Sequence, residues 1–164
     1  MKISQRALGL TTSPIRKLAP YANEAIRAGK KIYHLNIGQP DIPTSPKFMD
    51  AIRAFNDKVI AYGASQGDPA LIRAIQRYYA GWGMEFAEKH IYITNGGSEA
   101  LEFAALSLCD PGEELLVFEP YYANYSSFGK LAGAEIKAVP TSAEDGYRLP
   151  EEEEIEKYIT DKTR

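Results

Sequence analysis

The chain has little that would tie it to an oxidising compartment, a membrane or a nucleic acid. Its single cysteine, Cys109, excludes a disulfide within the chain, so a reducing, cytoplasmic compartment is expected. The net charge of −3 gives no basic surface for nucleic acid or anionic lipid. No apolar run is long enough to span a bilayer, and the first residues lack the apolar core of a signal peptide.

Metal ligands are also scarce. His34, His90 and Cys109 show none of the spacings, such as C-x-x-C or H-x-x-x-H, that gather ligands around one ion. No metal site is therefore predicted. The acidic run Glu151 to Glu154 follows Pro150 at an expected helix start, where carboxylates interact favourably with the helix dipole. We expect it to be a solvated face and not a catalytic carboxylate pair.

The most informative stretch runs from Ile91 to Leu101. It begins with the β-branched and aromatic residues of a strand, breaks at Gly96 and Gly97, and continues from Ser98 to Cys109 with apolar residues at helical spacing. Such a helix start attracts anions, because its first N–H groups are unpaired and the helix dipole favours negative charge. The stretch predicts a phosphate site, with glycines that serve only tight packing as the alternative.

Strands and helices alternate through the second half of the chain. Strands are expected over 91–94, 115–118 and 135–139, and helices over 98–108, 123–132 and 150–159. This order predicts βαβ units on a largely parallel sheet, with ligands beyond the carboxyl ends of its strands. Two of those ends are residues 95–98, an anion site, and residues 119–122, which offer aromatic faces. Together they suit a flat, phosphorylated aromatic ligand.

The first half is less regular. Residues 1–14 predict an extended arm, and residues 32–37 a short strand that leads into a loop rich in proline. Helices are expected over 15–28, 48–55 and 69–80. Pro20 predicts a kink or a late start in the first of these helices. Asp68 is expected to cap the third, which would bury Leu71, Ile75 and either Tyr78 or Tyr79.

Four motifs in a fixed order give the chain a family resemblance. They are Asn36-Ile37-Gly38-Gln39-Pro40-Asp41; Tyr62 with Gly67 and Leu71-Ile72-Arg73; Thr94-Asn95-Gly96-Gly97-Ser98-Glu99-Ala100-Leu101; and Pro120-Tyr121-Tyr122. In this order they resemble fold-type I aminotransferases of the class I/II, aspartate-aminotransferase-like group, which use pyridoxal 5′-phosphate. The resemblance implies an α/β three-layer sandwich with a mostly parallel sheet, here incomplete. It implies an N-terminal arm and small-domain segment over 1–45 and the first part of the large cofactor-binding domain over 46–164.

The resemblance also implies roles for single residues. Gly97 and Ser98, with Gly96, would hold the cofactor phosphate, and the ring of Tyr122 would stack on the pyridine ring. Tyr62 would reach the phosphate of the neighbouring subunit's cofactor, which makes a homodimer part of the active site. The backbone of Gly38 would lie against the substrate carboxylate. A half-buried tyrosine at the end of a strand and a simple turn glycine are the alternatives for Tyr122 and Gly38.

No catalytic residue is assigned, because the family's Schiff-base lysine is expected beyond Arg164. The chain resembles roughly the first two-fifths of such an enzyme and is expected to be inactive alone. The parent would transfer an amino group between an amino acid and a 2-oxo acid in amino acid metabolism.

One alternative is a Rossmann-like nucleotide-binding domain with Glu119 as its ribose-binding acid, although G-x-G-x-x-G is missing. The other is a non-catalytic fragment that only binds a partner chain.

Overall fold

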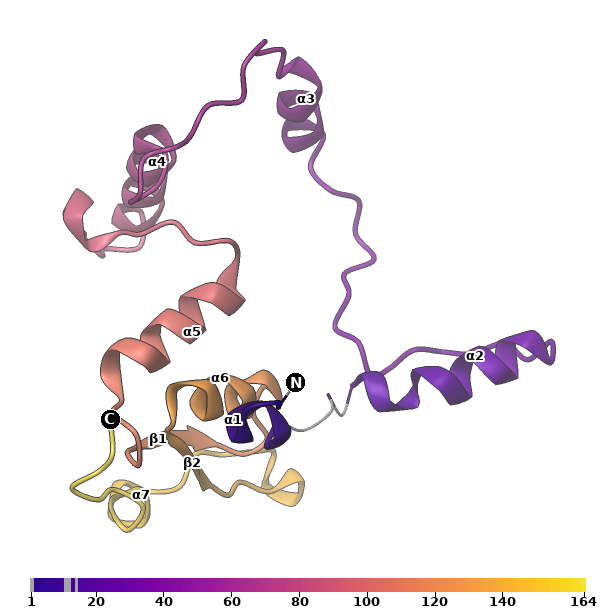
Figure 1. Ribbon diagram of the computed structural model, residues 1–164, viewed down its shortest axis with the longest axis vertical. Helices are drawn as coiled ribbons and strands as arrows, with labels where there is room; N and C mark the ends of the chain where they lie inside the picture. The colour runs from indigo at the N-terminus through magenta and orange to yellow at the C-terminus, as the bar shows by residue number, and fades with distance from the viewer. Residues whose placement is uncertain (1, 11–12, 14) are drawn as a thin grey trace. The chain divides into compact units, whose positions relative to one another are not determined.

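The computed structural model describes residues 2–10, 13 and 15–164 (Figure 1). Contacts between residues divide the chain into two compact units. The first unit joins the described residues up to His34 to the segment Asn95–Arg164, and the second unit is Leu35–Thr94. The division at residue 45 into a small-domain segment and a cofactor domain stays a prediction.

The centre of the first unit is a βαβ arrangement. Strand β1 (Glu114–Phe118) leads through helix α6 (Asn124–Ala132) to strand β2 (Glu135–Val139), and the two strands pair in parallel along their whole length. Helix α6 ends at Gly133, where φ is 84° and a Cβ atom would lie 3.2 Å from the Cα of Pro111. Glycine therefore serves both the helix end and the close approach of the chain. The predicted strands 115–118 and 135–139 and the helix between them are confirmed.

Helix α5 (Gly97–Leu108) packs against α6 and confirms the helix expected over 98–108. The two helices and both strands enclose an apolar cavity of about 160 Å³. Its lining comprises Leu101, Ala104, Ala105, Leu108, Leu115, Leu116, Val117, Tyr125, Phe128 and Ile136. The buried apolar residues of this unit are small or β-branched for the most part: Ala105, Cys109, Ala132, Ala134 and Val139. Small side chains at these positions let the helices approach the sheet closely.

Two predicted strands do not form. Residues 32–37 contain no strand, and residues 91–94 are extended without belonging to a sheet. Ile91 has the backbone angles of a strand, φ −117° and ψ 120°, and the N–H of Ile93 donates to the carbonyl of Gln66 at 2.9 Å. The sequence therefore favours extended backbone at 91–94, but a strand also needs a neighbour of matching register. Among the described residues the mostly parallel sheet has only two full strands.

The beginning of the first unit is helical where it was expected to be extended. Helix α1 (Gln5–Leu8) lies inside the predicted arm and is capped by Ser4, whose hydroxyl accepts from the N–H of Ala7 at 3.2 Å. Positions 1, 11–12 and 14 of that arm lie outside the described residues. A 3₁₀ turn, η1 (Arg16–Leu18), precedes helix α2 (Ala19–Arg27), which has Pro20 in its first turn. The late start predicted from this proline is confirmed.

The second unit contains helices α3 (Pro46–Ala54) and α4 (Pro69–Ala80) and the 3₁₀ turn η2 (Glu88–His90). Asp68 caps α4 as predicted, since its Oδ1 accepts from the N–H of Ala70 at 2.6 Å and of Leu71 at 3.3 Å. The predicted inward face is correct in part, because Ile75 is half-buried but Leu71 does not lie on the buried side. Ile72, 2% exposed, is the buried residue, whereas Leu71 is exposed.

The last residues of the first unit return to β1. They follow the 3₁₀ turn η3 (Ala143–Asp145) and helix α7 (Glu152–Glu156), which ends before the predicted Ile159. The N–H of Glu114 donates to the carbonyl of Lys162, and the N–H of Arg164 donates to the carbonyl of Glu114, each at 2.9 Å. These bonds form a parallel bridge along the edge of β1 that does not face β2. None of the described helices has the length and apolar character needed to cross a membrane.

Candidate functional site

The glycine turn before α5 is the predicted anion site. Gly96 has φ 85° and ψ 170°, a conformation that side chains disfavour, and Gly97 is the first residue of the helix. A Cβ atom at either glycine would meet no atom within 4 Å, so space is open on this side of the turn. No side chain caps the helix, and the N–H groups of Gly97, Ser98 and Glu99 have no acceptor within it. These donors and the positive end of the helix dipole both favour an anion at the start of α5.

A carboxylate that sequence reasoning missed holds this turn in shape. Oε2 of Glu99 accepts a hydrogen bond from the backbone N–H of Asn95. The bond ties the first turn of α5 to the residue before the glycines and leaves the N–H groups of Gly97 and Ser98 outside it. The signal was available, because an acidic residue at the third helical position often reaches back to the N–H groups ahead of the helix.

The loop between β1 and α6 presents a tyrosine whose ring and hydroxyl are both held. Tyr122 is 45% exposed, and its hydroxyl accepts from Nδ2 of Asn124 at 2.8 Å. The ring of Tyr125 stands perpendicular to that of Tyr122, with the centroids 5.7 Å apart. The carbonyl of Tyr122 also accepts from the N–H of Tyr125 at 2.9 Å. Tyr122 lies beyond the end of β1 at Phe118, and both the stacking role and the alternative of a half-buried tyrosine near a strand end stay predictions.

Its neighbour Tyr121 is held differently. The ring of Tyr121 lies parallel to that of Tyr125 with centroids 6.3 Å apart, and its hydroxyl is 3.1 Å from Oγ of Ser126. Tyr121 lines a pocket of about 520 Å³ beyond the carboxyl ends of β1 and β2. The other lining residues are Glu119, Pro120, Ala123, Ser126, Thr141 and Tyr147. Tyr121 therefore lines this pocket, whereas Tyr122 is not among its lining residues.

The remaining predicted site residues belong to the second unit. Tyr62 is fully exposed, at 106%, and a Cβ atom at Gly38 would meet nothing within 4 Å. The structure thus gathers Gly96, Gly97 and Ser98 on one turn and sets Tyr122 in the same unit. It brings neither Tyr62 nor Gly38 into that unit.

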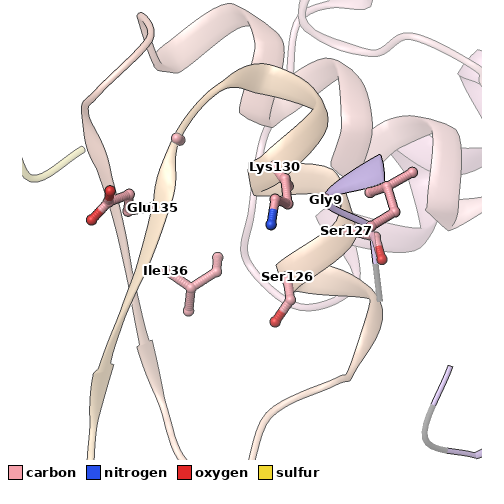
Figure 2. Close-up of a pocket in the computed structure, with 8 residues that line it drawn as sticks. Gly9, Ser126, Ser127, Lys130, Glu135 and Ile136 are labelled. Atoms are coloured by element: carbon pink, nitrogen blue, oxygen red, sulfur yellow. The ribbon is translucent and has the colours of Figure 1, made fainter. Parts of the chain in front are cut away.

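A further pocket in the first unit lies at the other end of the sheet. Its volume is about 390 Å³, and its lining combines Gly9 and Leu10 with residues of α6 and the start of β2 (Figure 2). Figure 2 shows Lys130, Ser126 and Ser127 on the face of α6 that borders it. A Cβ atom at Gly9 would lie 2.7 Å from Cε of Lys130, so glycine lets the segment after α1 cross this lysine. In parallel sheets ligands bind at the carboxyl ends of the strands, which this pocket does not border.

The site contains no cluster of ionisable groups. Among the described residues, no group of three His, Cys, Asp or Glu side chains is placed to hold a metal ion. Burial raises the pKa of the Cys109 thiol, and the nearby carboxylates of Glu113 and Asp110 add to this shift. A thiol held neutral in this way is a packing group and not a nucleophile.

Comparison with known proteins gives a consistent result. Residues 30–162 match the family model described as "Aminotransferase class I and II". The chain is 29% identical over 166 residues to the aspartate/prephenate aminotransferase of Nitrosomonas europaea, a match that covers 100% of this chain and 42% of the relative. It is 32% identical over 145 residues to the transaminase BacF of Bacillus subtilis, covering 86% of this chain and 36% of the relative.

Solved structures agree with the sequence matches. An alanine aminotransferase from Pyrococcus furiosus superposes with a TM-score of 0.89 at 32% identity, covering 99% of this chain and 42% of that one. The Thermus thermophilus aspartate aminotransferase with maleate gives a TM-score of 0.89 at 27% identity, covering 100% and 43%. The chain thus spans about two-fifths of the length of these relatives, 42% in the first. The α/β fold is that of these enzymes, and the Rossmann-like alternative gains no support.

Proposed function

The chain belongs to the class I and II aminotransferase family, and on this premise we propose that it is part of a pyridoxal 5′-phosphate enzyme that transfers an amino group between an amino acid and a 2-oxo acid. The observation that carries the proposal is the open glycine turn at the start of α5, which lies in the same unit as the exposed ring of Tyr122. The first feature suits a phosphate and the second suits a flat aromatic ring.

The residues present fit the phosphate group. A phosphate needs several converging donors and space, and the turn offers both: unpaired N–H groups at Gly97 and Ser98, the Ser98 hydroxyl, and no atom within 4 Å of a Cβ position at either glycine. Hydrogen bonds from such donors to a charged acceptor contribute about 1.5–3 kcal/mol each. The Glu99 carboxylate accepts from the N–H of Asn95, the residue before the glycines.

We assign each of these residues a separate role in binding the cofactor. When bound, pyridoxal 5′-phosphate supplies an electron sink beside the amino acid's α-carbon. The turn at Gly96, Gly97 and Ser98 binds the phosphate and fixes one end of the group. Tyr122 covers one face of its ring, a contact of the kind that contributes about 0.5–1.5 kcal/mol beyond burial, and excludes water from that face. The chain offers binding and orientation, whereas the Schiff-base lysine is expected beyond Arg164.

Further proposals concern the parent protein as a whole. Tyr62 would contact the phosphate in the neighbouring subunit of a cytoplasmic homodimer, and the backbone of Gly38 would contact the substrate carboxylate. The exposure of both residues in the second unit supports these assignments. The arm and small-domain segment would end near residue 45. This chain alone would bind the cofactor weakly and would not turn over an amino acid with a 2-oxo acid.

The proposed function is tested by the binding of pyridoxamine 5′-phosphate, which carries the phosphate and the ring but no aldehyde to react with lysines. Titration of the ¹⁵N-labelled chain should shift the amide resonances of residues 96–99. Gly96→Ala should weaken binding at least tenfold, because it strains a backbone with φ 85° and adds a methyl group beside the donors.

Gly112→Ala is the matched control. Gly112 has φ 91° and an equally empty Cβ position, but it lies in the turn before β1. It should leave binding unchanged. Equal losses in the two variants, or shifts confined to residues outside 96–99 and 122, would refute the proposal.

A further inference from the structure

Tyr122 is exposed and yet fixed, and this combination requires an explanation. A phenol ring on a surface loop normally samples several rotamers, and immobilising it on binding a ligand costs conformational entropy. Here the ring stands perpendicular to that of Tyr125, with the centroids 5.7 Å apart, and the hydroxyl is bonded to Asn124. The side chain is therefore restrained at both ends before any ligand arrives.

The two restraints rest on rigid supports. Asn124 and Tyr125 are the first two residues of α6, so the helix sets their backbone positions. Tyr125 is held in turn by the parallel ring of Tyr121, whose hydroxyl contacts Ser126. Tyr125 also lines the apolar cavity between α5 and the sheet. This network connects the loop to the core of the unit and ends at the hydroxyl of Tyr122.

We propose that Asn124 is a positioning residue for Tyr122, holding its ring in the orientation that stacks on the cofactor's pyridine ring. The inference rests on the proposed function. Only Asn124 reaches the hydroxyl of Tyr122 among the described residues, and its amide acts as the donor. Because the phenol oxygen then accepts, its own proton stays free to donate toward a bound group. Asn124 thus fixes both the plane of the ring and the direction of that proton.

The test uses two probes with the whole chain. Pyridoxamine 5′-phosphate reports on the turn and the ring together, and inorganic phosphate reports on the turn alone. Asn124→Ala should weaken binding of pyridoxamine 5′-phosphate about threefold to tenfold and leave binding of inorganic phosphate unchanged. Asn124→Asp keeps the size and the helix start, and its carboxylate can accept from the Tyr122 hydroxyl, so it should retain more of the binding than Asn124→Ala. Ser127→Ala, on the same helix, is the control and should change neither.

A double-mutant cycle shows whether Asn124 acts through the hydroxyl. In a Tyr122→Phe background, Asn124→Ala should have no further effect on pyridoxamine 5′-phosphate binding, because the hydroxyl it would hold is gone. Additive losses in the double variant would overturn the proposal, since Asn124 would then act independently of Tyr122.

A ligand-free measurement separates this inference from the proposed function. The chain is labelled with ¹³C in its tyrosine rings, and the Tyr122 signal is identified by its loss in Tyr122→Phe. In Asn124→Ala this signal should move toward the chemical shift of a freely rotating tyrosine. An unmoved signal would overturn the role of Asn124. If the signal moves but the unaltered chain binds no pyridoxamine 5′-phosphate, the restraint exists and the proposed function fails.

Discussion

A Cβ atom at Gly67 would lie 2.3 Å from Cγ1 of Ile93, closer than two unbonded carbon atoms can approach. The φ of Gly67 is 117°, a second reason for glycine here. This contact joins the loop before α4 to the extended segment before the glycine turn. Beside it, the N–H of Ile93 donates to the carbonyl of Gln66, and Nε2 of Gln66 donates to the carbonyl of Ile91 at 2.8 Å. The loop of the second unit thus orders residues 91–93.

We expect Gly67→Ala to destabilise the second unit by about 2–4 kcal/mol, from overpacking against Ile93 together with backbone strain. Urea denaturation followed by circular dichroism measures the loss. Gly63→Ala is the control, because Gly63 has an ordinary φ and nothing within 4 Å of its Cβ position. If both variants lose the same stability, the contact between Gly67 and Ile93 does not hold the loop.

Removal of the cap at Asp68 should destabilise α4. Oδ1 of Asp68 accepts from two N–H groups of the first turn, and Asp68→Ala leaves both without this acceptor. The expected loss is about 1 kcal/mol in the free energy of unfolding, seen as a lower urea midpoint. Asp68→Asn retains an oxygen at the same place and should lose much less. A loss as large in Asp68→Asn would mean that charge and not capping stabilises the helix.

Alternate amides of β1 should exchange at different rates. The N–H of Glu119 donates to the carbonyl of Val139, and the carbonyl of Glu113 accepts from the N–H of Glu135. The backbone N–H and carbonyl groups of the odd-numbered residues from 113 to 119 therefore point toward β2. The N–H of Leu116 points toward the opposite edge of β1. Among the described residues, only Glu114 makes backbone hydrogen bonds at that edge. Hydrogen exchange followed by NMR should show the amide of Leu116 exchanging at least tenfold faster than that of Val117. Equal protection of the two amides would mean that this edge is covered.

Cys109 should be unreactive and should make stability depend on alkaline pH. Burial raises the pKa of its thiol, the carboxylates of Glu113 and Asp110 add to the shift, and Arg164 opposes it. The folded state therefore keeps a proton that the unfolded state releases. The stability that this contributes is complete below the ordinary thiol pKa and is lost as pH rises through the raised value.

Two measurements check this behaviour of the thiol. Iodoacetamide at pH 7.5 should modify the folded chain much more slowly than the chain in 8 M urea, as determined by mass spectrometry. Cys109→Ala should reduce the decline in unfolding free energy between pH 8 and pH 10. Rapid modification of the folded chain, or an identical pH dependence in the variant, would contradict a buried neutral thiol.

The longer helices could be predicted from the sequence, because a helix forms its hydrogen bonds within one segment. The helix start at Gly97, the cap at Asp68 and the late start of α2 at Pro20 depend on neighbours within four residues. The helix start that forms part of the candidate site could also be predicted from neighbouring residues. The glycine break at residues 96 and 97 predicted the helix start, and Gly96, with φ 85°, immediately precedes α5. The binding roles of these residues, and of Tyr122, Tyr62 and Gly38, stay predictions.

Tertiary structure decided whatever depends on a partner from elsewhere in the chain. Residues 91–94 have the composition of a strand, but pairing needs a second edge, and they bond to a loop instead. The buried face of α4 contains Ile72 because the segment packed against it, and not the helical period, sets the rotation. The different surroundings of Tyr121 and Tyr122 and the contact of Asn124 with a phenol oxygen arise from distances between side chains. The order of residues along the chain does not specify those distances.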